Sequence, residues 1–136
     1  MNNDIISMTV LSFYPDVEAV YIFGSHGTED EWQDSDVDIA LLLSPGRAKV
    51  IKGLIMTDCW LALADVLKKE VDLVNLRQVN TVFQREIIIN GRVLYKKDEN
   101  IVDCFEMNVL SAYQKLNEER AGILQEIFRT GRILNV

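Results

Sequence analysis

The stretch of sequence that decides the fold runs from residue 21 to residue 43 and reads YIFGSHGTEDEWQDSDVDIALLL. Two strongly apolar runs enclose a polar insert, which begins at Gly24-Ser25 and ends at Asp36-Val37-Asp38. Carboxylates at the start of a buried apolar strand are costly unless something compensates their charge. The stretch therefore predicts two buried strands, and it predicts a ligand for the carboxylates that lie between them.

The rest of the chain alternates helical and extended patterns. Within residues 47–69, for example, apolar residues recur at spacings of three and four, which is typical of a helix. Alternation of this kind predicts an α/β or α+β fold, with a small mixed β-sheet flanked by helices. Strands are expected at residues 18–25, 36–43, 71–76 and 92–95, and helices at residues 3–14, 47–69, 79–90 and 98–130.

The last of these segments, residues 98–130, predicts one long C-terminal helix. It carries an apolar stripe with a polar break near Glu119. Two interpretations stay open: the stripe packs on the core, or part of it contacts a partner or a second copy in a homodimer. The residues of the stripe are Val102, Phe105, Val109, Ala112, Leu116, Ile123 and Ile127.

Length and composition limit the classes of protein to consider. The 136 residues, 49% of them apolar, are expected to form a single domain with its own core. No apolar run approaches the roughly 18–20 residues that span a bilayer, and the first residues lack a signal-type pattern, so we expect a cytoplasmic protein without membrane contact. Cys59 and Cys104 are far apart and are expected to be ordinary apolar residues, with no role in a metal or redox site.

Charge argues against nucleic acid as a ligand. The net charge is −7, and residues 1–50 hold nine acidic residues against two basic ones, Arg47 and Lys49. Binding of long nucleic acid requires clustered Lys and Arg. The acidity favours metal ions or a basic partner protein.

Three carboxylates form the candidate catalytic set. Asp36 and Asp38 are two residues apart in a predicted strand, so both should point to the same face and repel each other. They either bond to backbone and solvent or share a divalent cation, and Mg²⁺ is usually held by one or two carboxylates together with phosphates and water. Asp72 lies in the next predicted strand among apolar residues, and it would complete a two-metal site.

The Gly24-Ser25 turn supplies candidate phosphate ligands. Free backbone N–H groups at such a turn, together with the Ser25 hydroxyl, suit phosphate oxygens, and glycine allows close approach. Residues 26–31 contain no Arg or Lys, so further contacts would come from backbone groups, from His26 or from a basic residue elsewhere. The whole stretch therefore predicts a site for a metal–nucleoside triphosphate.

The pattern Gly24-Ser25, Asp36-x-Asp38 and Asp72 resembles the signature of the DNA polymerase β-like nucleotidyltransferase superfamily. The blocks FGSHGTEDEWQDSDVDIALLL, VDLVNL and REIIINGRVLY occur in the order seen in MNT-type minimal nucleotidyltransferases. This resemblance covers about residues 17–97. It implies a palm-like nucleotidyltransferase fold, with residues 1–136 as one minimal domain in which the helix at 98–130 follows the core.

The resemblance also implies a function. Members of this family are antitoxins that transfer AMP from ATP to a tyrosine of a HEPN-domain ribonuclease toxin, with which they form hetero-oligomers. By the resemblance, Asp36, Asp38 and Asp72 would bind two Mg²⁺ ions, with Asp72 on the catalytic ion, and Gly24 and Ser25 would hold the triphosphate. Two alternatives stay open. One is a nucleotidyltransferase that acts on a small-molecule or nucleic-acid hydroxyl, and the other is a non-enzymatic antitoxin that blocks its partner by binding.

Overall fold

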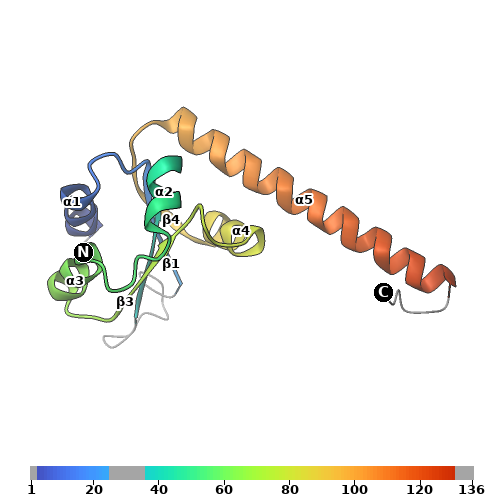
Figure 1. The fold of residues 1–136 in the computed structure, drawn as a ribbon, viewed down its shortest axis with the longest axis horizontal. Coiled ribbons are helices and arrows are strands. Elements are labelled where there is room, and N and C mark those ends of the chain that lie inside the picture. Colours follow the sequence, from blue (N-terminus) through green and yellow to red (C-terminus); the bar gives the residue numbers. More distant parts are fainter. Residues whose placement is uncertain (1–2, 25–35, 131–136) are drawn as a thin grey trace.

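The computed structural model describes residues 3–24 and 36–130, which form a four-stranded sheet and five helices (Figure 1). The sheet has the strand order β3-β2-β1-β4; β2 and β3 are parallel, and the other pairs are antiparallel. This mixed sheet with helices on both faces confirms the predicted fold class. In chain order the elements are α1 (Asn3–Phe13), β1 (Ala19–Phe23), β2 (Val37–Leu42), α2 (Pro45–Ile51), α3 (Asp58–Leu67), β3 (Val71–Asn75), α4 (Thr81–Asn90), β4 (Arg92–Lys96) and α5 (Glu99–Thr130).

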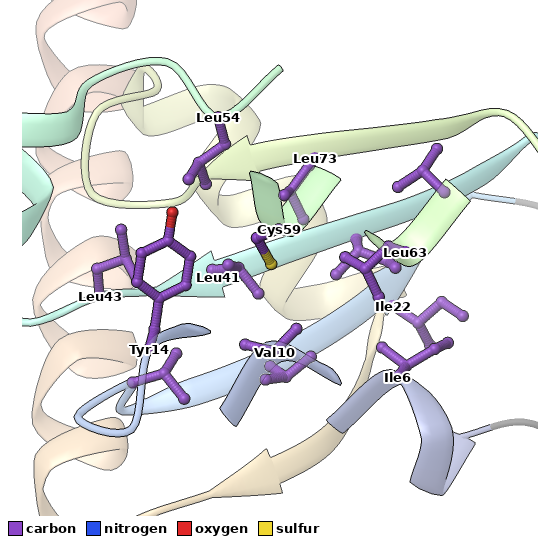
Figure 2. Close-up of a cluster of buried hydrophobic side chains, with 14 of the residues drawn as sticks. Ile6, Val10, Tyr14, Ile22, Leu41, Leu43, Leu54, Cys59, Leu63 and Leu73 are labelled. Carbon is purple, nitrogen blue, oxygen red and sulfur yellow. The ribbon is translucent and has the colours of Figure 1, made fainter. Parts of the chain in front are cut away.

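One face of the sheet is covered by α1 and α3 (Figures 1 and 2). Side chains alternate along each strand, so every second residue of β1, β2 and β3 points to this face. The two central strands, β1 and β2, are buried on both faces, which explains why their sequences read as continuous apolar runs. The cluster on this face includes Ile6, Val10, Ile22, Ile39, Leu41, Cys59, Leu63 and Leu73.

The opposite face is covered by α4 and by the first turns of α5. Ala40 and Leu42 of β2 pack there with Ile87 of α4 and Val102 of α5. Tyr21 of β1 is buried on the same face, and its hydroxyl donates a hydrogen bond of 2.7 Å to the carboxylate of Glu106 in α5. Burial and this carboxylate raise the pKa of Tyr21 far above its ordinary value, so the hydroxyl keeps its proton and ties α5 to the central strands.

Helix α5 packs on the sheet with its first half alone. Val102 and Val109 are buried, whereas Ile123, Leu124 and Phe128 are 51%, 54% and 82% exposed. Figure 1 shows the helix running past α4 and away from the rest of the chain. The apolar stripe predicted from the sequence is therefore core at its beginning and uncovered surface at its end.

The prediction of one helix over residues 47–69 is wrong. Two helices, α2 and α3, occupy this segment, and residues 52–57 separate them. Lys52 and Met56 have positive φ angles of 59° and 72°, which a continuous right-handed helix does not allow. The spacing of the apolar residues is preserved across the break, which is why the sequence pattern did not show it.

Tertiary contacts explain the break between the two helices. The buried side-chain amide of Asn75 donates hydrogen bonds to the carbonyl oxygens of Ala48 and Lys52, at 3.1 and 2.9 Å, and so satisfies the end of α2. Leu54, in the connection itself, is buried in the core. Thr57 then caps α3, because its hydroxyl oxygen accepts a hydrogen bond from the backbone N–H of Trp60.

Among the described residues, none of the helices combines the length and the apolar character that would be needed to cross a membrane.

The core beneath α3 gives a direct test of the fold. Leu63 is fully buried in the cluster between α3 and the sheet, whereas Leu61 on the same helix is 52% exposed. We expect Leu63→Ala to lower the free energy of unfolding by about 2–5 kcal/mol, because it removes buried methyl groups and leaves a cavity. The matched control Leu61→Ala should change it by less than about 0.5 kcal/mol. Urea denaturation followed by circular dichroism measures both, and equal losses would contradict this packing.

Candidate active site

Two of the predicted carboxylates lie side by side on neighbouring strands. Asp38 of β2 and Asp72 of β3 are direct partners in the parallel register. Because Ala40 and Val74 pack on the face covered by α4 and α5, the alternation of each strand places Asp38 and Asp72 on this face too. The sequence predicted that Asp72 lies in the next strand and near Asp38, and the structure places it there.

Asp36 holds a different place from the one predicted. It precedes the first residue of β2, Val37, and it is exposed, so it is not a strand residue that shares a face with Asp38. The backbone N–H of Val37 donates a hydrogen bond to the carbonyl oxygen of Glu70, and the pairing of β2 with β3 begins there. Asp36 lies one residue before this first hydrogen bond. Asp36 is nevertheless close enough to act on Asp38 electrostatically.

The environment of Asp38 disfavours its charged form. Partial burial raises the pKa of its carboxyl above the ordinary 3.8, and repulsion from the Asp72 and Asp36 carboxylates raises it further. Three negative groups thus converge at one end of the sheet, and a cation would relieve their repulsion. Among residues 3–24 and 36–130, however, no three His, Cys, Asp or Glu side chains are arranged so that they alone could hold a metal ion.

The carboxylate donors still fit Mg²⁺, because this ion is usually held by only one or two carboxylates and takes its other ligands from substrate phosphates and water. Asp38 and Asp72, adjacent in register, provide such a pair.

Gly24 lies directly against the carboxylate of Asp38. Its φ angle is +74°, and a Cβ atom at this position would lie 3.1 Å from Cγ of Asp38 and closer still to Oδ2. A side chain is therefore excluded both by backbone conformation and by the carboxylate. The sequence predicted that Gly24 permits close approach to phosphate; its contact with Asp38 is an additional reason for glycine here.

An aromatic pair borders the carboxylates, and sequence reasoning did not identify it as part of the site. Phe23 of β1 is the register partner of Asp38 across the antiparallel pair. Its ring packs edge-on against Phe83 of α4, with the ring centroids 5.7 Å apart. The alternation of β1 was the available signal, since it places Phe23 on the same face as Tyr21.

Ser25 and His26, the other candidate phosphate ligands, lie outside the described residues. Their roles remain predictions, as do the metal-binding roles of Asp36, Asp38 and Asp72.

The fold and this arrangement of carboxylates define a class of protein. Residues 5–100 match the family described as Polymerase beta, Nucleotidyltransferase, and the chain belongs to this family. The match includes all five predicted site residues, and the family predicted from Gly24-Ser25 and the three carboxylates is confirmed.

Individual relatives specify the kind of nucleotidyltransferase that this chain resembles. It is 29% identical over 113 residues to the protein adenylyltransferase MntA of Shewanella oneidensis, and the match covers 83% of this chain and 78% of that protein. A crystal structure of a toxin–antitoxin with AMP-PNP contains a chain that is 27% identical, with a TM-score of 0.75 and coverage of 94% of this chain and 99% of that one. A tri-AMPylated Shewanella oneidensis HEPN toxin in complex with MNT antitoxin gives 26% identity and a TM-score of 0.69, with coverage of 93% and 96%. These relatives confirm the predicted likeness to MNT-type antitoxins.

The contact between Gly24 and Asp38 predicts a sensitive position. Gly24→Ala should displace the Asp38 carboxylate and should also strain the backbone by about 1 kcal/mol. We expect nucleotide transfer to fall by at least about tenfold. Gly46→Ala is the matched control, because a Cβ there meets nothing within 4 Å. Transfer assays on both variants measure the effect, and a fully active Gly24→Ala variant would exclude the contact.

The raised pKa of Asp38 predicts a pH-dependent stability. The folded state binds the proton of the Asp38 carboxyl more tightly than the unfolded chain does. Ionisation of Asp38 therefore lowers the free energy of unfolding as the pH rises above 3.8 and through the pKa of the folded state. Without divalent cations, Asp38→Asn should therefore melt at a higher temperature than the wild type at pH 7, and the difference should vanish at about pH 2, where Asp38 is protonated in both the folded and the unfolded state.

The control for this test is Asp65→Asn, which removes one carboxylate from the exposed pair of Asp65 with Lys68. It should not raise the melting temperature at pH 7. A wild-type protein that is as stable as Asp38→Asn at pH 7 in EDTA would argue against the repulsion among the three carboxylates.

Proposed function

We propose that this chain is an Mg²⁺-dependent adenylyltransferase and antitoxin, which transfers AMP from ATP to a tyrosine hydroxyl of a partner HEPN toxin and thereby neutralises it. The observation that carries the proposal is the register pairing of Asp38 with Asp72, with Gly24 packed on Asp38, in a member of the nucleotidyltransferase family. The likeness to the adenylyltransferase MntA and to complexes of MNT antitoxin with HEPN toxin supports this choice of nucleotide and acceptor.

The proposed reaction is a displacement at the α-phosphorus of ATP. The tyrosine oxygen forms a bond to the α-phosphorus, the bond from this phosphorus to the oxygen bridging the α- and β-phosphates breaks, and pyrophosphate leaves. The hydroxyl proton is lost to solvent. The products are a tyrosine–AMP phosphodiester and pyrophosphate.

The residues of the site have separate roles in this proposal. Asp36, Asp38 and Asp72 would hold two Mg²⁺ ions, and Gly24 and Ser25 would bind the triphosphate. Bound Mg²⁺ supplies charge neutralisation for the phosphates and a lower pKa for the attacking hydroxyl. The carboxylates orient the reacting groups, and the partly buried position of Asp38 keeps part of the site away from water.

The charge of the chain supports a protein acceptor. The net charge of −7 opposes the approach of an RNA or DNA strand and favours a partner with basic groups. A tyrosine is also suited chemically, because a phenol with a pKa of about 10 is more easily converted to a nucleophile than an alkyl hydroxyl. We place the reaction in the cytoplasm and the whole chain, residues 1–136, in one minimal nucleotidyltransferase domain.

Asp72 provides the decisive variant. Wild-type protein incubated with Mg²⁺, ATP and a purified HEPN toxin as the proposed partner should raise the mass of that toxin by one or more AMP units. Asp72→Asn should slow this transfer by about 100-fold or more, equivalent to a few kcal/mol of barrier, because the catalytic cation loses a ligand. ATP binding should remain, since Gly24 and Asp38 are unchanged. The control is Asp65→Asn, an exposed carboxylate of α3, which should transfer at the wild-type rate.

The alternative functions predict other outcomes. Label from α-phosphate-labelled ATP on RNA or on a small molecule, and on no protein, would favour a different acceptor. Neutralisation of the toxin by the Asp72→Asn variant at wild-type potency would favour a non-enzymatic antitoxin.

A further inference from the structure

The distal half of α5 is an apolar surface that nothing in the described part of the chain covers. Val102 and Val109 of this helix are buried against the body, but beyond them Ile123, Leu124 and Phe128 are more than half exposed. With a rise of 1.5 Å per residue, the 32 residues of α5 extend about 48 Å, and the helix runs past α4 in Figure 1. A helix end without tertiary packing is only marginally stable in water, so a partner that covered this half would stabilise it.

The exposed surface continues a face that is already used for packing. Successive residues of a helix are rotated by about 100°, so Leu116, Arg120, Ile123 and Ile127 lie on one side of α5. Leu116 and Arg120 line a groove of about 610 Å³ between α4 and α5, together with Val82 and Glu86 of α4. Past this groove, the stripe of Ile123, Leu124, Ile127 and Phe128 has no facing helix among the described elements.

This surface lies on the same side of the sheet as the carboxylates. Asp38 and Asp72 point to the face that α4 and α5 cover, as Ala40 and Val74 of the same strands do. A protein that sits on the distal half of α5 and in the adjoining groove therefore lies on the same side of the sheet as Asp38 and Asp72.

We propose that the distal stripe of α5 (Ile123, Leu124, Ile127 and Phe128) and the groove between α4 and α5 form the surface on which the HEPN toxin docks for modification. The inference rests on the proposed function and adds the place of the partner. The docked toxin presents an apolar patch to the stripe and polar or charged groups to Glu86 and Arg120 in the groove.

Two observations favour the toxin over a second copy of this chain. The net charge of −7 opposes self-association and favours a partner with basic groups. In addition, solved structures of relatives that match 93–94% of this chain are of toxin–antitoxin complexes, so chains of this kind assemble with a toxin. Contact between two copies of this chain would also give no reason for α5 to lie on the same side of the sheet as Asp38 and Asp72.

The test compares charge substitutions on opposite sides of the distal helix. Ile123→Glu and Phe128→Glu each place a carboxylate in the stripe, and Gln125→Glu, the matched control for Ile123→Glu, places the same charge about 200° around the helix from Ile123. The probe is the purified HEPN toxin that the proposed function assigns to this chain as its partner. Its dissociation constant from each variant is measured by titration calorimetry, and transfer is followed by its mass at low and at saturating probe concentration.

We expect Ile123→Glu and Phe128→Glu to weaken binding of the probe at least tenfold and to slow transfer at low probe concentration, with recovery at saturation. Gln125→Glu should behave as the wild type, and all variants should keep the wild-type melting temperature and ATP affinity. Docking through the stripe would then act on the KM for the probe and leave kcat unchanged.

Other results separate the possible errors. Wild-type affinity of both stripe variants for the probe overturns the docking surface. A wild-type chain that is dimeric in light scattering and becomes monomeric in Ile123→Glu, with probe binding unchanged, assigns the stripe to a second copy and also overturns it. If the stripe variants lose binding while even the wild type adds no AMP to the probe, the docking surface stands and the proposed function fails.

Discussion

The parallel pairing of β2 with β3 holds the Asp38 and Asp72 carboxylates side by side at one end of the sheet, and the rest of the site depends on this register. A slip of β2 by one residue would turn Asp38 to the opposite face, into the apolar cluster beneath α1 and α3, and would separate it from Asp72. The register is fixed because Ile39 and Leu41 fill that cluster and Ala40 and Leu42 fill the other. The two cores therefore determine where the repelling charges lie.

The repulsion is tolerated because it is confined to the end of a well-buried strand. Beyond Asp38, the remaining residues of β2 are completely buried, and their burial opposes the cost of the carboxylates. The arrangement stores an electrostatic cost that a bound cation would relieve, so stability and ligand binding are linked at the same side chain. Gly24 belongs to this balance, because any side chain there would push the Asp38 carboxylate aside.

Helix α5 connects the core to the outer surface of the molecule. Its first half is anchored by Val102, by Val109 and by the hydrogen bond from Tyr21 to Glu106, whereas its second half carries the same apolar stripe into solvent. A stripe of this kind is a cost to an isolated chain unless a partner covers it.

The sequence by itself determined the family and the order of the strands along the chain, because buried strands and a Gly-Ser turn leave strong local patterns. The same patterns predicted the three carboxylates as site residues. Tertiary structure decided the rest. The break between α2 and α3 depends on Asn75, which contacts Ala48 and Lys52 from a distant strand, and no periodicity reveals such a contact. Asp36 lies outside β2 because pairing with β3 begins at Val37. The limit of burial on α5 is likewise set by where the sheet and α4 end, since its apolar residues are alike in sequence and differ only in what they touch.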